Sequence, residues 1–144
     1  MDGDQASGDG RPPVRVSSIP GKGRGVVATR RIAEAEVILR DPVLVIPGEE
    51  WGHLQHTVIS RYCFSWHDER DDSAIVLGVG SLLNHSYQPN ACAYTSRRER
   101  VIEIVALRDI EAHEEVTINY NPESDALRPM DFRVRGGRRA GQPG

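Results

Sequence analysis

Three short segments of the sequence concentrate residue types that can bind a small molecule or act in catalysis. The first, residues 21–26 (GKGRGV), alternates glycine with basic residues. Glycines let the backbone approach a ligand closely and adopt positive φ, and exposed N–H groups beside Lys22 and Arg24 suit a carboxylate or a phosphate. The segment lacks the spacing of a dinucleotide-binding fingerprint, and no Gly-Lys-Ser/Thr follows as in a P-loop. A tight hairpin that binds nothing explains the same glycines equally well.

The second segment, residues 82–91 (LLNHSYQPNA), is a polar stretch that begins at the end of an apolar run. The Asn84 amide offers both a donor and an acceptor, a combination that can read an adenine edge or a carboxylate. His85 either binds a ligand or holds the loop through hydrogen bonds. As an isolated fragment, the segment is more often a structural loop than a site.

The third segment, residues 114–120 (EEVTINY), is a β-like run that ends in Tyr120. A tyrosine at the end of a strand usually packs half-buried. In a cleft, its phenol can orient a nucleophile or accept a proton.

Short β-strands must position these segments. Alternating or β-branched runs bounded by Gly and Pro are typical of strands, and residues 51–66, with mixed apolar spacing, predict a short helix or an irregular insert. Pro42 separates two of the runs and favours edge strands there. The pattern predicts a mainly β domain of small sheets. The predicted strands cover residues 14–17, 26–29, 37–40, 43–46, 92–96, 101–107 and 116–120, with a further strand entering a turn over 74–80 and an acidic loop over 68–73.

Composition restricts the class of protein. The chain has 144 residues and a formal net charge of -3, which fits one domain and is too weak a bias for bulk nucleic-acid binding. No run approaches the ~20 apolar residues that a bilayer span needs, and the polar N-terminus is unlike a secretory signal. The two cysteines, Cys63 and Cys92, make neither a disulfide framework nor a four-Cys zinc site. A cytoplasmic protein is therefore expected, with the nucleus as the alternative if the source is eukaryotic.

Taken in this order, the three segments resemble the motifs of the SET-domain protein methyltransferases. GKGRGV is similar to the family's first glycine motif, NHSYQPN to its Asn-His-Ser-x-x-Pro-Asn motif, and EEVTINY to its glutamate-rich strand that ends in Tyr. The resemblance divides the chain into a disordered tail over 1–12, a SET domain over 13–121, and a lid segment with an Arg/Gly-rich tail over 122–144.

The resemblance implies a SET fold of several small β-sheets, in which the C-terminal strand is tucked through a loop as a pseudoknot. It implies S-adenosylmethionine as methyl donor and a protein lysine as acceptor. Tyr120 matches the family's catalytic tyrosine, and Tyr62, in the insert, is a weaker candidate for lining the lysine channel. The residues that would contact the donor are Lys22, Gly23, Arg24, Gly25, Asn84 and His85.

The larger members of the family often carry zinc-binding Cys clusters before and after the domain, and this chain has neither. The loosely spaced His53, His56, Cys63 and His67 are better explained as surface and packing residues, so no metal is expected. Without a Cys-rich C-terminal segment, Phe132 is a candidate lid over the adenine, with plain packing equally favoured.

The alternative function is a non-catalytic SET-like module that binds a protein partner. The presence of Asn84, His85 and Tyr120 together favours the enzyme. A homodimer that completes the substrate groove, and contact of the Arg-rich tail with nucleic acid, are weaker expectations about partners; a membrane is not expected.

Overall fold

The computed structural model describes residues 10–67, 70–120 and 133–134, and in these residues the fold is mainly β. Its strands form a two-stranded hairpin, a six-stranded sheet and a two-stranded parallel pair, so the prediction of several small sheets is confirmed. In sheet order the strands are β1 (Val14–Ile19) and β2 (Gly23–Ala28); β10 (Arg133–Val134), β4 (Cys63–His67), β5 (Asp72–Val76), β3 (Val37–Ile46), β8 (Val101–Ala106) and β7 (Ala91–Ser96); and β6 (Asn84–His85) and β9 (Thr117–Ile118).

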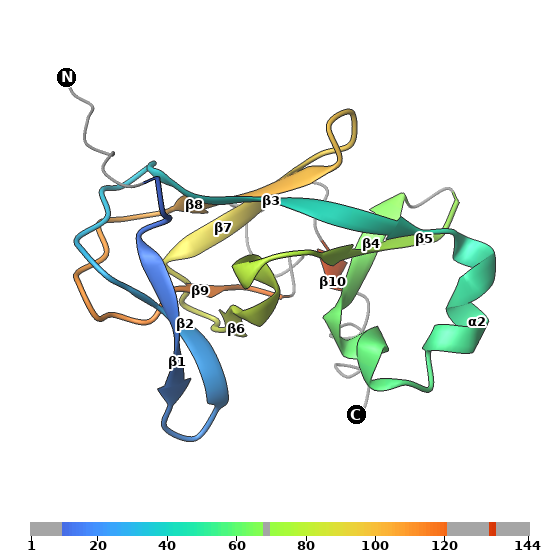
Figure 1. Cartoon of the computed structure of the whole chain (residues 1–144), viewed down its shortest axis with the longest axis horizontal. Coiled ribbons are helices and arrows are strands. Elements are labelled where there is room, and N and C mark those ends of the chain that lie inside the picture. The colour runs from blue at the N-terminus through green and yellow to red at the C-terminus, as the bar shows by residue number, and fades with distance from the viewer. Residues whose placement is uncertain (1–9, 68–69, 121–132, 135–144) are drawn as a thin grey trace.

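Strand β3 connects the two halves of the large sheet (Figure 1). Its first part pairs with β8 up to Pro42, and its second part pairs with β5 from Val43 onward. The prediction of two separate strands over 37–40 and 43–46 is therefore wrong. Proline, which has no N–H to donate, fits inside this strand because it stands where the strand changes partner, and its carbonyl accepts the Leu77 N–H at 2.9 Å.

The insert predicted over 51–66 is helical only in its first part. One turn of α2 (Trp51–Leu54) follows the 3₁₀ turn η1 (Gly48–Glu50), and the 3₁₀ helix η2 (Val58–Tyr62) comes next. The following residues form β4, contrary to the prediction. The rings of Phe64 and Trp66 in this strand are buried and meet edge to face. The predicted acidic loop also ends early, because Asp72 and Ser73 are buried in β5.

The hydrophobic core explains why the glycine-rich segment projects from the domain. The second half of β2 is buried from Gly25 to Ala28, whereas Gly23 and Arg24 are exposed. Val26 accepts a hydrogen bond from the Val116 N–H at 2.8 Å, which attaches β2 to the segment that leads into β9. The apolar half of the strand thus anchors it, and the glycine half faces outward.

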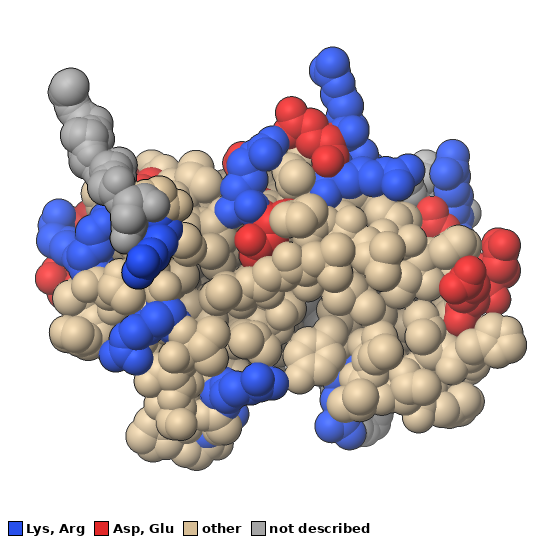
Figure 2. All heavy atoms as spheres, in the orientation of Figure 1, with Lys and Arg blue, Asp and Glu red and all other residues tan. Residues whose placement is uncertain are grey.

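Some predictions concern residues outside the described ranges. These are residues 1–9 of the tail predicted over 1–12, the lid segment with Phe132, and residues 135–144 of the Arg/Gly-rich tail. Residues 133 and 134, predicted as part of that flexible tail, instead form β10 and pair with β4. The parallel β6–β9 pair is the described part of the expected pseudoknot; threading of the chain through a loop stays a prediction. Among the described helices, none is long and apolar enough to cross a membrane. Lys and Arg side chains are scattered over the face in Figure 2 rather than gathered in one stripe.

Candidate functional site

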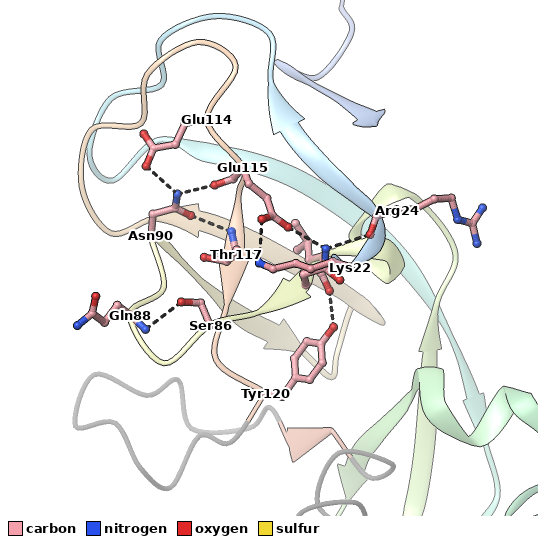
Figure 3. Close-up of polar contacts among 11 residues, drawn as sticks. Lys22, Arg24, Ser86, Gln88, Asn90, Glu114, Glu115, Thr117 and Tyr120 are labelled. Atoms are coloured by element: carbon pink, nitrogen blue, oxygen red, sulfur yellow. Dashed lines mark hydrogen bonds and ion pairs between the residues drawn. The ribbon is translucent and has the colours of Figure 1, made fainter. Parts of the chain in front are cut away.

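The three chemically distinctive segments meet beside the parallel β6–β9 pair. Asn84 and His85 form β6, and they pair with Thr117 and Ile118 of β9. Lys22 and Arg24 of the β1–β2 hairpin lie beside this pair, where they contact Glu115 and Asn84 (Figure 3). The sequence predicted that these segments meet only through the family resemblance. Hydrogen bonds and one ion pair hold them together in the structure.

Asn84 connects all three segments through one amide group. Its Nδ2 donates to the Arg24 main-chain oxygen at 2.9 Å and to Glu115 Oε2 at 2.8 Å. Both amide hydrogens are thereby used. Among the contacts of the described residues, Asn84 Oδ1 accepts none, so this oxygen remains available to a donor group on a ligand.

Gly25 is required for this close approach. A Cβ at position 25 would lie 2.6 Å from Asn84 Nδ2 and 2.8 Å from Glu115 Oε2, well inside ordinary contact distance. Gly23 has a different role, because its φ of +81° is in the left-handed region that favours glycine. The two glycines therefore serve packing and turn formation respectively.

Glu115 is a site residue to which the sequence analysis gave no role. Its carboxylate accepts from Asn84 and forms an ion pair with Lys22, whose Nζ lies 3.0 Å from Oε1. Lys22, a predicted donor contact, is thus held beside the cluster. Arg24, by contrast, contributes its main-chain oxygen, and its guanidinium points away (Figure 3).

Asn90 is a second residue that sequence reasoning left without a role. Its side chain is 2% exposed, with Oδ1 accepting the Thr117 N–H at 2.9 Å and Nδ2 donating to the Glu115 carbonyl at 2.8 Å. It therefore fixes the start of β9 against the loop after β6. The signal for it was the Pro-Asn pair inside the second motif.

Tyr120 contacts the second motif through both its phenol and its backbone N–H. Its Oη donates to the Leu83 main-chain oxygen at 2.5 Å, and its backbone N–H donates to His85 Nδ1 at 3.0 Å. Burial raises the pKa of the Tyr120 phenol, with smaller contributions from Tyr62 and Glu115. The phenol is therefore protonated at neutral pH.

His85 is held as a neutral imidazole. Burial lowers its pKa, and the nearby positive charge of Lys22 lowers it further. Because Nδ1 accepts the Tyr120 N–H, the ring proton belongs on Nε2, which is buried and has no hydrogen-bond partner among the described residues. The exposed Tyr87 packs edge-on against this ring with centroids 4.3 Å apart.

Tyr62 lies at the end of η2 with 42% of its surface exposed. It makes a small electrostatic contribution to the raised pKa of the Tyr120 phenol, and no direct hydrogen bond joins the two residues in the described part of the chain. In the same part of the chain, no three His, Cys, Asp or Glu side chains are grouped so that they could hold a metal ion.

The arrangement is suited to bind a polar ligand and to orient a neutral nucleophile. The Arg24 carbonyl and the Glu115 carboxylate lie on the hairpin side of the site. On the other side is the Tyr120 phenol, whose hydrogen is already donated to the Leu83 carbonyl.

Comparisons with known proteins agree with these features. The sequence profile described as "SET domain" matches residues 23–121. A Schizosaccharomyces pombe histone-lysine N-methyltransferase, specific for H3 lysine-37, is 34% identical over 111 residues, which cover 76% of this chain and 74% of the relative.

Solved structures share the fold. A Plasmodium falciparum protein solved as a candidate histone methyltransferase superposes with a TM-score of 0.63 at 23% identity, covering 77% of this chain and 95% of that one. The methyltransferase domain of the human histone-lysine N-methyltransferase SETMAR gives a TM-score of 0.65 at 22% identity, covering 81% of this chain and 47% of that one.

Proposed function

The chain belongs to the SET domain family of S-adenosylmethionine-dependent lysine methyltransferases, and from this premise we propose that it methylates a lysine of a histone tail, with Tyr120 orienting the amine. The histone class is carried over from the fission-yeast relative, whose described substrate is histone H3. With a histone as substrate, we propose that the protein works in the nucleus rather than in the cytoplasm that composition favoured.

The residues present fit the methyl donor. When bound, S-adenosylmethionine supplies a sulfonium methyl for in-line displacement by an amine. Asn84 Oδ1 is available to its ammonium group, and the buried Nε2 of His85 lacks a partner among the described residues. Gly25 allows the backbone to lie close to Asn84. We assign donor contacts to Lys22, Gly23, Arg24, Gly25, Asn84 and His85.

The hydrogen bond from Tyr120 to Leu83 supports the proposed role of the phenol. Because the phenol hydrogen is directed to the Leu83 oxygen, the Tyr120 oxygen presents its lone pairs as acceptors. It can accept one N–H of a neutral lysine and so orient the nitrogen lone pair. Orientation of this kind is a proximity effect and needs no proton removal in the transfer step.

The lysine must also enter as a neutral amine, although its free pKa is about 10.4. A narrow apolar approach disfavours the ammonium form. We place Tyr62 at the wall of this approach, because it contributes to the raised pKa of the Tyr120 phenol and is partly exposed.

The proposal is tested by incubating the full chain with histone octamers and methyl-labelled S-adenosylmethionine. We expect label on a histone lysine, located by mass spectrometry, and its loss in Tyr120→Phe but not in Tyr94→Phe, an exposed tyrosine on β7. Equal labelling by Tyr120→Phe would refute the assigned role. Labelling of other lysine-containing proteins but not of histones would refute the substrate class alone.

Two finer expectations about partners remain proposals. One is a homodimer that completes the substrate groove, and the other is contact between the tail over 135–144 and nucleic acid.

A further inference from the structure

The chain segment that leads into the site is attached to strand β3 at two adjacent residues. The Leu77 N–H donates to the Pro42 carbonyl at 2.9 Å, and the Gly80 N–H donates to Asp41 Oδ2 at 2.9 Å. Between Gly80 and β6 lies only the end of the 3₁₀ turn η3 (Val79–Leu82) and Leu83. Asp41 thus holds the turn from which the site residues emerge.

The two glycines of this turn make room for the Asp41 carboxylate. A Cβ at Gly78 would lie 2.5 Å from Asp41 Cγ and 2.7 Å from each carboxylate oxygen, and these are the three nearest atoms. A Cβ at Gly80 would lie 2.9 Å from Asp41 Oδ2. The glycine spacing in GVGSLLNHS therefore has a physical cause, since backbone and carboxylate must approach closely.

The position of this turn determines where the site residues that follow it lie. The Ser81 N–H and Oγ both donate to the Gly78 carbonyl, at 3.0 and 2.9 Å, and close the turn. Three residues after Gly80, the Leu83 carbonyl accepts the Tyr120 phenol hydrogen, and the next residue, Asn84, donates to Arg24. A displacement at Gly80 is only one turn away from both contacts.

We propose that Asp41 is a positioning residue for methyl transfer: its carboxylate fixes the turn over residues 78–82, so that the Leu83 carbonyl meets Tyr120 and the Asn84 amide meets Arg24. A hydrogen bond to an ionised acceptor is roughly twice as strong as a neutral one, which suits an acceptor that must define a backbone position. The inference rests on the proposed function of Tyr120 and Asn84.

The first test compares Asp41→Ala with Asp41→Asn in the full chain. Asn keeps an oxygen that can accept the Gly80 N–H, whereas Ala removes it. We expect Asp41→Ala to raise the donor Kd and to lower kcat, each by about tenfold, with little change in KM for the lysine substrate, because misplacement of reacting groups acts on the transfer step. Asp41→Asn should recover most of both losses.

Asp109→Ala is the matched control. The Asp109 carboxylate also accepts a backbone N–H, from Glu34 at 2.8 Å, but outside the site. We expect its donor Kd and kcat to stay within about twofold of the parent chain. An Asp41→Ala variant that lowers the melting temperature but keeps the parent Kd and kcat would overturn the inference.

A double-mutant cycle adds a test that loss of folding cannot imitate. Gly78→Ala should impair donor binding and kcat, because its methyl collides with Asp41. In the Asp41→Ala background the added methyl has room, so the double variant should be no worse than Asp41→Ala. Equal impairment by Gly78→Ala in both backgrounds would refute the role of Asp41. If Asp41→Ala does not fold, Gly78→Ala alone decides: parent values of Kd and kcat refute the inference.

Failure of the inference is separable from failure of the proposed function. If Tyr120→Phe and Asn84→Ala lose activity while Asp41→Ala does not, only the role of Asp41 is wrong. If those two variants are fully active, the assigned site itself is wrong.

Discussion

The phenol oxygen of Tyr120 lies 2.5 Å from the main-chain oxygen of Leu83 and donates its proton there. This contact joins the third motif to the second at the residue just before Asn84. It leaves the phenol as an acceptor toward the space beside it, and burial, which raises its pKa, keeps it protonated through neutral pH. The site is thus organised by main-chain acceptors as much as by side chains.

Replacing Tyr120 by Phe should separate catalysis from donor binding. The ring and its packing remain, but the acceptor for the lysine N–H is lost, so kcat should fall by about 100-fold. Donor affinity, measured by titration calorimetry, should change by less than about twofold. A variant with near-normal turnover would contradict the role of the phenol.

Asn84→Ala should weaken binding of the methyl donor. The change removes Oδ1, the acceptor proposed for the donor's ammonium group, and it removes the hydrogen bonds from Nδ2 to Arg24 and Glu115. A hydrogen bond to a charged group contributes about 1.5–3 kcal/mol, so the donor Kd should rise by roughly 10- to 100-fold. Titration calorimetry on the folded variant measures this change. Unchanged affinity would remove Asn84 from the donor site.

Asn90→Ala provides the structural contrast. This change leaves the buried Thr117 N–H without its acceptor, and an unpaired buried donor costs about 1–3 kcal/mol. Chemical denaturation should therefore show a loss of stability of that size. A fully stable variant would mean that the Thr117 N–H finds another acceptor.

Gly25→Ala should impair both packing and donor affinity, because its methyl would displace Asn84 and Glu115. Gly52→Ala is the matched control, since a Cβ there meets nothing within 4 Å. Replacing a helical glycine by alanine should stabilise the chain by about 0.5–1 kcal/mol. Thermal unfolding and calorimetry of both variants distinguish the two effects, and equal behaviour would exclude close packing at Gly25.

Acidification should destabilise the protein through His85. Its pKa is lowered in the folded state by burial and by Lys22, so below about pH 6.5 the unfolded chain binds more protons than the folded one. Stability from this group is therefore present above that pH and is lost as the pH falls toward the folded-state pKa. Protonation would also remove the Nδ1 acceptor from the Tyr120 N–H, so kcat should decline together with stability.

The measurement is an NMR titration of the histidine ring signals, with His85→Gln used to assign the His85 resonance. We expect His85 to titrate below the free-histidine value. Titration at or above that value would contradict the buried neutral imidazole.

The sequence was sufficient to predict the fold class and to predict that the three motifs meet in the structure. Their order and spacing singled out Asn84, His85 and Tyr120 by resemblance; the structure brings these residues together, and their roles stay predictions. The apolar half of β2 was visible as a strand. These features are local, or belong to motifs that are read as units.

Long-range contacts explain what the sequence could not predict. Pro42 reads as a strand breaker because nothing nearby in the sequence shows that β3 changes partner at that residue. β4 lacks alternation because its residues from Cys63 to Trp66 are all buried. The roles of Glu115 and Asp41 depend on partners 31 to 93 residues away. The need for glycine at positions 78 and 80 is likewise visible only when Asp41 is seen to pack against them.

The Lys22–Glu115 ion pair, which spans 93 positions of the chain, has a consequence for biosynthesis. The β1–β2 hairpin is local and can form early, whereas closing a loop of this length is entropically costly and slow. In a ribosome-bound chain, the Lys22–Glu115 ion pair and the Tyr120–Leu83 hydrogen bond form only after the segment from Glu115 to Tyr120 has left the ribosome. A product that ends before residue 115 therefore lacks both of these contacts, which join the third motif to the rest of the candidate site.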